Sequence, residues 1–407
     1  MRASDARLTH APSINDSYGV LFRGNSRSDG ELLRLFLLTL LAFSLVPNMD
    51  QSVLRISVDK KTNDLPFPRF GQPQKLGEYT VTRDRCVVLG REDAKYLYEA
   101  ALADGGRVRF DLNKGFSTFE EKVMEISFLE EGDERLDILL DWITSQAPRG
   151  GPLKKVLHEA DFLCWRGLLT RIAATPFCPK DSWEFAAARI GDVIFLCERE
   201  TEETQQRKLS MSQRDKMMTY WGFKFEQYMT VAEKEGQPNV DQFVTCREEF
   251  AVVVRSTLAS TAGKPLKLVY SGEVDAINKD GDLVELKTQR NALEGFFWKQ
   301  KSMKWWLQSF LLGVRDIIVG YRDDDGFVKK VGSVHTDDLC KRGEWSGNIC
   351  MNLLSTVLTS VRDLLKRDGE ACIVRYEQNR DEITIHSASL PDIDFFTYNF
   401  RVHFNLE

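Results

Sequence analysis

Apolar and polar residues alternate along this chain with two different periods, and the period separates helices from strands. Apolar residues near helical spacing predict helices at 133–145 and 297–312. Short stretches rich in β-branched and aromatic residues predict strands. These strands are expected at 192–198, 250–255, 266–277, 283–288 and 317–321. The pattern predicts a mixed α/β protein, a single large domain with mixed β-sheets flanked by helices.

The N-terminal part carries an apolar run, 35–46, that follows several arginines. A membrane-spanning helix needs about 20 apolar residues, so this run is too short. It is open to three interpretations: a displaced signal-peptide core, a helix that packs on the protein, or part of a disordered extension. We expect residues 1–48 to be an extension outside the core, a domain at 49–407, and no stable membrane association.

The composition limits the possible partners and chemistry. The 407 residues are 43% hydrophobic and carry a formal charge of −6, so any contact with nucleic acid must come from a local basic patch. The eight cysteines form no Cys-x-x-Cys pair, and the five histidines show no zinc-ligand spacing. We therefore expect reduced thiols, and neither a zinc site nor a serine–histidine triad.

The segment 268–290 predicts a β-hairpin, because an Asp-Gly turn separates two apolar runs. Strand side chains alternate between the two faces of a sheet. Glu273 and Asp275 should therefore project from one face of the first strand, and Glu285 and Lys287 from one face of the second. Across the turn, the two pairs can meet.

Three carboxylates close together raise one another's pKa unless a cation compensates. Oxygen ligands favour Mg²⁺ or Mn²⁺, and the lysine can orient a water molecule or neutralise a phosphoryl oxygen. The Asp-x9-Glu-x-Lys spacing resembles the core of PD-(D/E)XK nucleases. The alternative is a solvated hairpin with cross-strand salt bridges.

Three further segments bear on this choice. Glu226 is the single acidic residue of the aromatic-rich stretch 218–229, either a functional carboxylate or the rim of a core helix. Arg166 lies in the apolar segment 162–177, a setting where arginine meets a carboxylate or a phosphate. Lysines and tryptophans interleave in 296–314, which suits single-stranded nucleic acid or one buried helix face.

Several motifs in order resemble the DXO family of decapping exoribonucleases, from about Pro66 to near the C-terminus. They are PFPRFGQPQKLGEY, CWRGLLT, TYWGFKFEQYM, SGEVD, VELKT, KWWLQSFLLGV and NICMNLL. The loop between Arg255 and Glu273 is longer, and the following hairpin shorter, than expected from vertebrate relatives. The resemblance is more specific than the hairpin alone and implies a PD-(D/E)XK nuclease-like core.

The resemblance also implies a site. It implies two Mg²⁺ ions, replaceable by Mn²⁺, with ligands Glu226, Asp275 and Glu285, support from Glu273, and a further oxygen from the Leu286 carbonyl. It implies catalytic roles for Lys287 and Glu273. It implies substrate contacts from Arg85, Glu134, Trp165, Arg166, Gly167, Lys287 and Gln308.

The implied function is hydrolysis at RNA 5′ ends in quality control. The expected activities are release of a whole cap or an NAD cap, 5′-to-3′ exoribonuclease activity, and pyrophosphate release from 5′-triphosphate ends. Family habit implies a nuclear location, with the cytoplasm as an alternative. Two rival functions stay open: a protein that mainly binds and stabilises a nuclear 5′-to-3′ exoribonuclease, and a DNA-directed nuclease on the same core.

Overall fold

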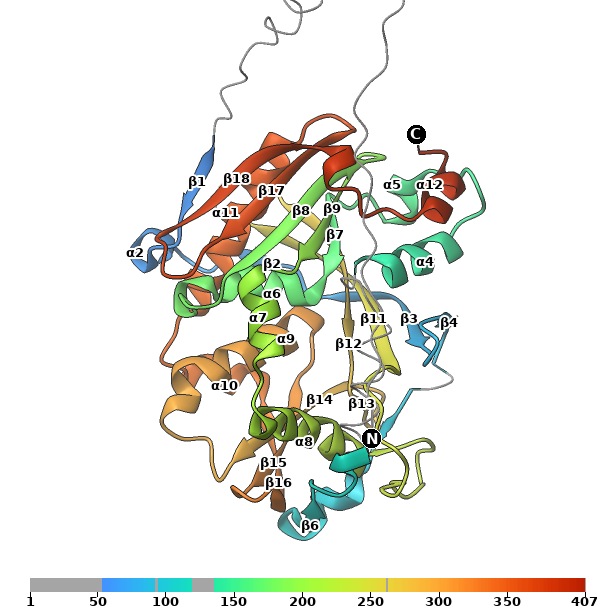
Figure 1. Ribbon diagram of the computed structural model, residues 1–407, viewed down its shortest axis with the longest axis vertical. Coiled ribbons are helices and arrows are strands. Elements are labelled where there is room, and N and C mark those ends of the chain that lie inside the picture. Colours follow the sequence, from blue (N-terminus) through green and yellow to red (C-terminus); the bar gives the residue numbers. More distant parts are fainter. Residues whose placement is uncertain (1–52, 92–93, 119–134, 261–262, 407) are drawn as a thin grey trace, which may run out of the picture. The chain divides into compact units, whose positions relative to one another are not determined.

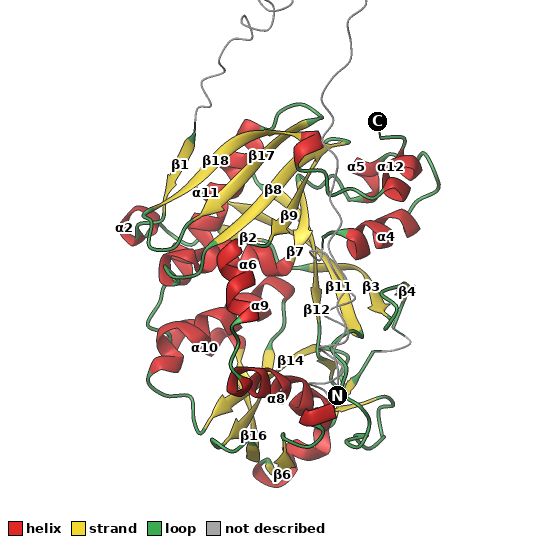
Figure 2. Cartoon of the chain, viewed as in Figure 1, coloured by secondary structure: helices red, strands yellow, loops and turns green. Residues whose placement is uncertain are grey.

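Two β-sheets organise the described part of the chain, and helices lie between them and on their outer faces (Figures 1 and 2). The computed structural model describes residues 53–91, 94–118, 135–260 and 263–406. Within these residues, the larger sheet has 11 strands and the smaller sheet has 7. The mixed α/β prediction is confirmed. The expected extension 1–48 and Glu134 lie outside the described residues.

The larger sheet is mixed, because β7 runs parallel to both of its neighbours, β9 and β12. Across this sheet the order is β1 (Leu54–Ser57), β18 (Glu382–Ser389), β17 (Glu370–Tyr376), β8 (Trp183–Ile190), β9 (Val193–Arg199), β7 (Phe162–Trp165), β12 (Leu266–Glu273), β11 (Glu249–Ala259), β3 (Gln74–Val81) and β4 (Val87–Leu89). The short β2 (Arg69–Phe70) pairs with β11.

The smaller sheet is mixed as well, because β14 and β15 run parallel. Its order is β10 (Thr230–Val231), β5 (Tyr96–Leu97), β13 (Ala276–Ile277), β14 (Leu283–Arg290), β15 (Asp316–Arg322), β16 (Phe327–His335) and β6 (Arg107–Asp111). The predicted hairpin is the antiparallel pair of β13 and β14, in which Ala276 lies opposite Val284.

The helices form layers around the sheets. The α-helices are α2 (Lys60–Asn63), α4 (Asp137–Ser145), α5 (Leu153–Val156), α6 (Arg166–Ala174), α7 (Glu202–Leu209), α8 (Gln213–Met229), α9 (Ser302–Leu312), α10 (Thr336–Arg342), α11 (Gly347–Leu364) and α12 (Tyr398–Phe404). The 3-10 helices are η1 (Glu99–Gly105), η2 (Thr175–Phe177) and η4 (Leu390–Asp392), and η3 (Phe297–Lys301) is a π-helix.

Three hydrophobic cores join these layers. One core packs α6, α9 and α11 against one face of the larger sheet and also reaches Ile317 and Val319 of the smaller sheet. A second packs α4 and α12 on the opposite face of the larger sheet. The third packs α8 on the other face of the smaller sheet. Central strands such as β8 are apolar almost throughout because both of their faces are covered.

One predicted strand is wrong. The sequence suggested a continuous strand at 266–277, but β12 ends at Glu273 in the larger sheet and β13 begins at Ala276 in the smaller one. An alternating pattern cannot reveal this break, because β12 and β13 are each regular and only their pairing partners differ. The predicted helix 297–312 begins as a π-helix before α9, and α4 starts at Asp137.

Within the described residues, no helix combines the length and the apolar character that crossing a bilayer requires.

Gly320 of β15 allows α8 to pack closely on the smaller sheet. A methyl group added there would lie 2.8 Å from Cδ2 of Phe225 and closer still to Cε2. We expect Gly320→Ala to destabilise the protein by about 1–3 kcal/mol, the usual cost of overpacking. Gly222→Ala on the same helix is the control, because it meets no atom within 4 Å and should stabilise the helix by up to about 1 kcal/mol. Urea unfolding of both variants tests this; equal midpoints would contradict it.

Candidate active site

The seam between the two sheets carries the acidic residues of the hairpin. Only Val274 and Asp275 separate β12 from β13. The Val274 N–H donates to the Phe250 carbonyl (2.9 Å), which holds the seam to β11. The Asp275 carboxylate accepts a hydrogen bond from the Leu286 N–H (2.6 Å), which holds it to β14. Glu273 and Asp275 thus do not share one face of one strand, as the sequence had suggested.

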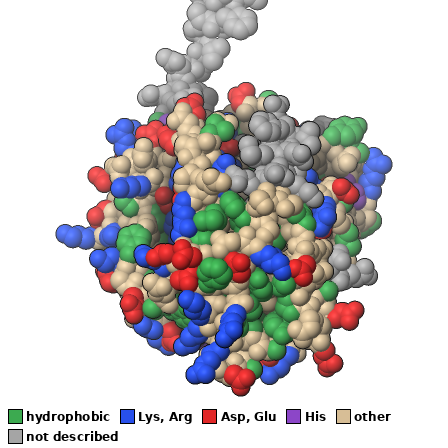
Figure 3. Space-filling view, turned by 60° about the horizontal axis from the view of Figure 1, so that its bottom comes forward, with side chains coloured by type: hydrophobic (Ala, Val, Ile, Leu, Met, Phe, Trp, Pro, Cys, Tyr) green, Lys and Arg blue, Asp and Glu red, His purple; other side chains and the backbone are tan. Residues whose placement is uncertain are grey.

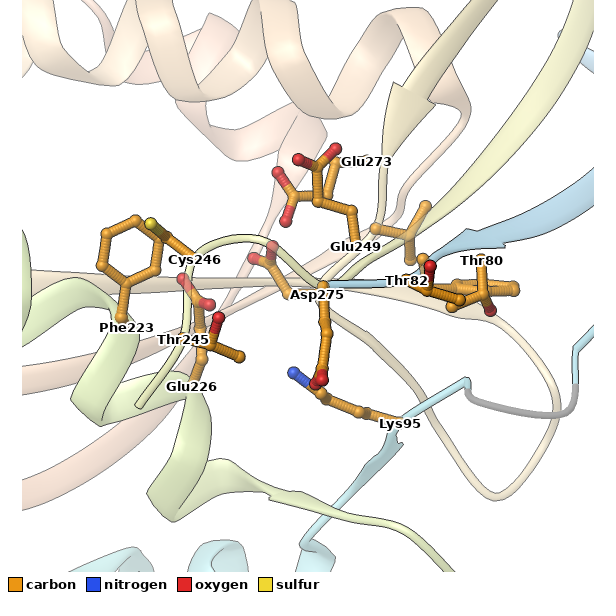
Figure 4. A pocket seen from close by; sticks show the side chains of 13 residues that line it. Thr80, Thr82, Lys95, Phe223, Glu226, Thr245, Cys246, Glu249, Glu273 and Asp275 are labelled. Atoms are coloured by element: carbon orange, nitrogen blue, oxygen red, sulfur yellow. The ribbon is translucent and has the colours of Figure 1, made fainter. Parts of the chain in front are cut away.

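Both residues nevertheless open into one pocket of about 200 Å³. Figure 4 shows the labelled carboxylates entering this pocket from three places: Glu226 from α8, Glu249 from the start of β11, and Glu273 and Asp275 from the seam. We call it the acidic pocket. It gathers residues that are far apart in the sequence, so only the tertiary fold assembles it.

Strand β14 supplies the other two predicted residues, which are not among those that line the acidic pocket. Glu285 is buried, and its carboxylate pairs with the Lys287 ammonium group. Leu286 between them packs into the core under α8, as the predicted alternation required. Burial opposes the charged form of Lys287, but Glu285 and Asp275 together raise the pKa of its ammonium group. Lys287 therefore remains charged at neutral pH.

The carboxylates of the acidic pocket hold their protons more tightly than ordinary carboxylates. Burial and the charges of Asp275 and Glu273 raise the pKa of Glu226 well above its usual value. The Glu273 side chain is exposed within the pocket, yet the protein around it and the charges of Asp275 and Glu249 raise its pKa to about 8. Burial and Glu285 raise the pKa of Asp275 to about 6, against the opposing effect of Lys287. The nearby cations therefore do not fully offset the negative charge of this cluster.

Oxygen donors that lack compensating charge fit a hard divalent cation. Within the described residues, no three His, Cys, Asp or Glu side chains already form a metal cage. The carboxylates repel one another, so they do not converge by themselves. Asp275 accepts a hydrogen bond from the Leu286 N–H, and Glu285 pairs with the Lys287 ammonium group. The chemistry of the donor set fits a cation that draws these carboxylates together.

Arg166 begins α6 directly after β7, next to the acidic pocket. It is buried, yet its Nε and Nη1 atoms have no hydrogen-bond partner within the described residues. Gly272 leaves room for it, because an added Cβ there would lie 3.1 Å from Nε of Arg166. Its charge also lowers the pKa of Asp275. A buried guanidinium without partners is costly, and an anionic ligand would relieve that cost.

Most of the other residues predicted to contact the substrate line one of two cavities. Trp165, Arg166 and Gly167 line a cavity of about 550 Å³ that also includes Glu249 and Glu273. We call it the central cavity.

Trp165 is held in place by its indole N–H, which donates to the Arg135 carbonyl (3.0 Å). Gln308 of α9 instead lines a neighbouring groove, where Gly167 is also present. Arg85 reaches the acidic pocket through an ion pair with Glu249 (2.8 Å).

Sequence reasoning missed Glu249 and Lys95, which both line the acidic pocket. Glu249 contributes to the raised pKa of Glu273, and Lys95 opposes the raised pKa of Glu226. The available signal for Glu249 was an acidic pair directly before the predicted strand at 250–255. Lys95 had no comparable signal, because the short β5 that follows it shows no clear periodicity.

The fold and the acidic pocket define a nuclease of the PD-(D/E)XK class. Residues 71–401 match the model of the RAI1-like PD-(D/E)XK nucleases, and the chain belongs to this family. The resemblance to the decapping exoribonucleases is thereby confirmed.

Relatives with known names support the assignment. Decapping nuclease dom-3 of Caenorhabditis elegans is 41% identical over 326 residues, covering 78% of this chain and 80% of the relative. The human decapping and exoribonuclease protein is 31% identical over 322 residues, covering 74% of this chain and 78% of the relative. Among solved structures, Rai1 of Candida albicans in complex with pU5 and Mn²⁺ has a TM-score of 0.68 at 19% identity, covering 85% and 98%. This likeness supports the fold.

The raised pKa of Asp275 predicts a pH-dependent stability in the absence of divalent ions. The folded protein binds this proton more tightly than the unfolded chain does, so stability falls as the pH rises from the ordinary value of 3.8 towards about 6. Asp275→Asn keeps a hydrogen-bond acceptor for Leu286 but cannot ionise. In the presence of a chelator, the melting temperature of the variant should exceed that of the wild type at pH 7. The difference in melting temperature should be smaller at about pH 4.5.

Thermal unfolding at several pH values measures this difference. Asp280→Asn in the exposed turn of the hairpin is the control, because it makes the same chemical change outside the acidic pocket. An Asp275→Asn variant that melts below the wild type at pH 7 in a chelator would show that the acidic pocket already has its counter-charge.

Proposed function

We propose that this chain hydrolyses RNA at its 5′ end in a reaction that depends on divalent metal ions. The observation that carries the proposal is the acidic pocket, where carboxylates with raised pKa lie next to Arg166, whose Nε and Nη1 have no hydrogen-bond partner among the residues that the structure describes. The relatives named above are a decapping nuclease and a decapping exoribonuclease. A pocket that combines metal-binding oxygens with a phosphate-binding cation suits that reaction.

The proposed metal ligands are Glu226, Asp275 and Glu285, with Glu273 and the Leu286 carbonyl in support. Mg²⁺ is the proposed ion, two ions per site, and Mn²⁺ should substitute for it. Bound divalent ions lower the pKa of water and stabilise the negative charge that develops on a phosphate group. Solved structures of related Rai1 and Dxo1 proteins contain Mn²⁺ or Ca²⁺.

The side chains of this chain hold the substrate. Arg166 is proposed to bind a phosphate group with its fork of N–H donors, between Trp165 and Gly167 in the central cavity. Lys287, charged at neutral pH, is proposed to position the water molecule or a phosphoryl oxygen. Arg85 is proposed to contact the same strand of RNA, and its pairing with Glu249 fixes its position.

Hydrolysis at the first internal phosphodiester accounts for the proposed products. Water adds to phosphorus, the bond from phosphorus to the 3′ oxygen breaks, and the proton of water ends on that oxygen. The same cleavage releases a whole cap or an NAD cap from a capped end, and a nucleotide from a 5′-monophosphate end. We propose that the chain acts in the nucleus, in the quality control of RNA 5′ ends, and that it binds an exoribonuclease as a partner.

Replacing Glu226, Asp275 or Glu285 by Ala should each lower the rate by at least about 10²-fold, because each change removes a metal-binding oxygen. The folded structure should persist, since each change also relieves repulsion. Hydrolysis of 5′-phosphorylated RNA with Mg²⁺, with Mn²⁺ and in EDTA measures the effect, with thermal unfolding as the control. Full activity in excess EDTA would contradict metal dependence, and matched DNA substrates test the rival DNA-directed function.

Arg166→Lys should impair the enzyme more than a conserved charge suggests, because an ammonium group cannot reproduce the bidentate fork on phosphate. The loss should appear mainly as weaker RNA binding, measured by fluorescence anisotropy alongside turnover. Arg401→Lys is the control, because Arg401 of α12 already pairs with Asp394 at 2.6 Å and lines neither the acidic pocket nor the central cavity. Unchanged binding and turnover in Arg166→Lys would leave Arg166 with a structural role only.

A further inference from the structure

A basic groove adjoins the central cavity, with which it shares Gly167 and Arg171. It has a volume of about 320 Å³ and runs between α6, α7 and α9 (Figure 1). Helix α6 contributes Gly167, Thr170 and Arg171, and α9 contributes Lys304 and Gln308. These spacings place each set on one side of its helix, and α6 packs on α9. The groove is therefore a regular feature of two packed helices.

The groove is positively charged although the whole chain is acidic. Arg171, Arg207 and Lys304 line it together with one carboxylate, Asp181. Arg171 also pairs with Glu198, which lies outside the lining (2.9 Å). Lys304 Nζ lies 2.8 Å from Asp181, and Arg207 Nη1 lies 4.0 Å from it, so one carboxylate faces two cations. On the face drawn in Figure 3, acidic and basic side chains are dispersed among one another. The excess of cations is thus confined to the groove. An acidic protein that binds a polyanion needs such a local basic site.

The groove connects with the acidic pocket through the central cavity. Glu249 and Glu273 line both the acidic pocket and the central cavity. Gly167 and Arg171 line both the central cavity and the basic groove. A single strand that passes Arg166 therefore has a continuous path along the surface of α6. Gly167 is exposed and has no atom within 4 Å of an added Cβ, so the path is open at this point.

The lining of the groove selects phosphate rather than a base. None of the described residues that line it is aromatic, so it offers no platform on which a base or a nicotinamide ring could stack. Its cationic side chains are partly exposed, which leaves the outer end open to a chain that continues into solvent. The buried Thr170 hydroxyl oxygen and the Gln308 amide add uncharged polar groups along the same path.

We propose that this groove binds the phosphates of the RNA strand on the 3′ side of the bond that is cut. The inference rests on the proposed function and adds the route by which the strand leaves the site. Lys304 and Arg207 exchange their contact with Asp181 for contacts with RNA phosphates. Lys304 and Arg207 thereby increase the affinity for the RNA strand, whereas the residues around the acidic pocket carry out hydrolysis at the 5′ end of that strand.

The test variant is Lys304→Gln together with Arg207→Gln in the full-length protein. The matched control is Lys329→Gln together with Arg380→Gln, which removes two exposed cations that also pair with carboxylates, Asp323 and Glu377. Two substrates share the same 5′-monophosphate end: a dinucleotide and a strand of about 12 nucleotides, long enough to fill a single-strand site. Values of kcat/KM and dissociation constants are measured for both lengths over a range of salt concentrations.

The test variant should lose about 10-fold or more in kcat/KM on the longer strand relative to the dinucleotide, mainly through KM. The dependence of binding on salt should weaken by about 1.4 in the slope of log K against log salt, since each phosphate contact contributes about 0.7 for single strands. The control should match the wild type on both lengths. An equal loss on both lengths would place the 5′ end group in this groove and overturn the proposal, as would no loss on either.

Asp181→Asn gives an independent result. If Asp181 competes with phosphate for Lys304 and Arg207, the longer strand should bind several-fold more tightly to this variant. Unchanged or weaker binding would show that the cations serve only to hold Asp181, and would overturn the proposal. If the wild-type protein hydrolyses neither substrate, the proposed function fails, whereas the anisotropy measurements still decide whether the groove binds RNA.

Discussion

The repulsion between carboxylates at the seam of the two sheets is the constraint on which the site depends. Asp275 raises the pKa of both Glu226 and Glu273, and Glu285 raises that of Asp275, whereas Lys287, Arg166 and Lys95 act in the opposite direction. A protein maintains such a cluster at a cost to its own stability. The cluster persists because the fold around it is extensively packed, with three hydrophobic cores that meet the two sheets.

The seam itself explains why one pocket can draw on so many elements. Strand β12 leaves the larger sheet and β13 enters the smaller one within two residues, so the side chains at the junction face the gap between the sheets. Helix α8 brings Glu226 from the smaller sheet, and β11 brings Glu249 from the larger one. The Leu286 N–H fixes the Asp275 carboxylate against β14. The arrangement is therefore set by backbone pairing rather than by flexible loops.

Charge is distributed unevenly along the path from this pocket. The acidic pocket is compensated by few cations, and the basic groove has more cations than carboxylates along its lining. Between them, the central cavity holds the buried Arg166, whose Nε and Nη1 find no hydrogen-bond partner in the described part of the chain. A nucleic acid strand needs these opposite properties at different points: metal ions where a phosphate is attacked, and side-chain cations where the backbone is only held. A net charge of −6 is compatible with this division because the interactions are local.

Short-range features of this protein could be predicted from its residues alone. Strand alternation places Glu285 and Lys287 on one face and Leu286 on the other, and the Asp-Gly pair predicts the hairpin turn. The fold class followed from the alternation of helical and extended segments. Three features became visible only in the folded protein: 266–277 divides between two sheets, Glu249 joins the acidic pocket, and Lys304 pairs with Asp181. Each of these depends on contacts between segments far apart in the chain, and local periodicity carries no information about which segments pair.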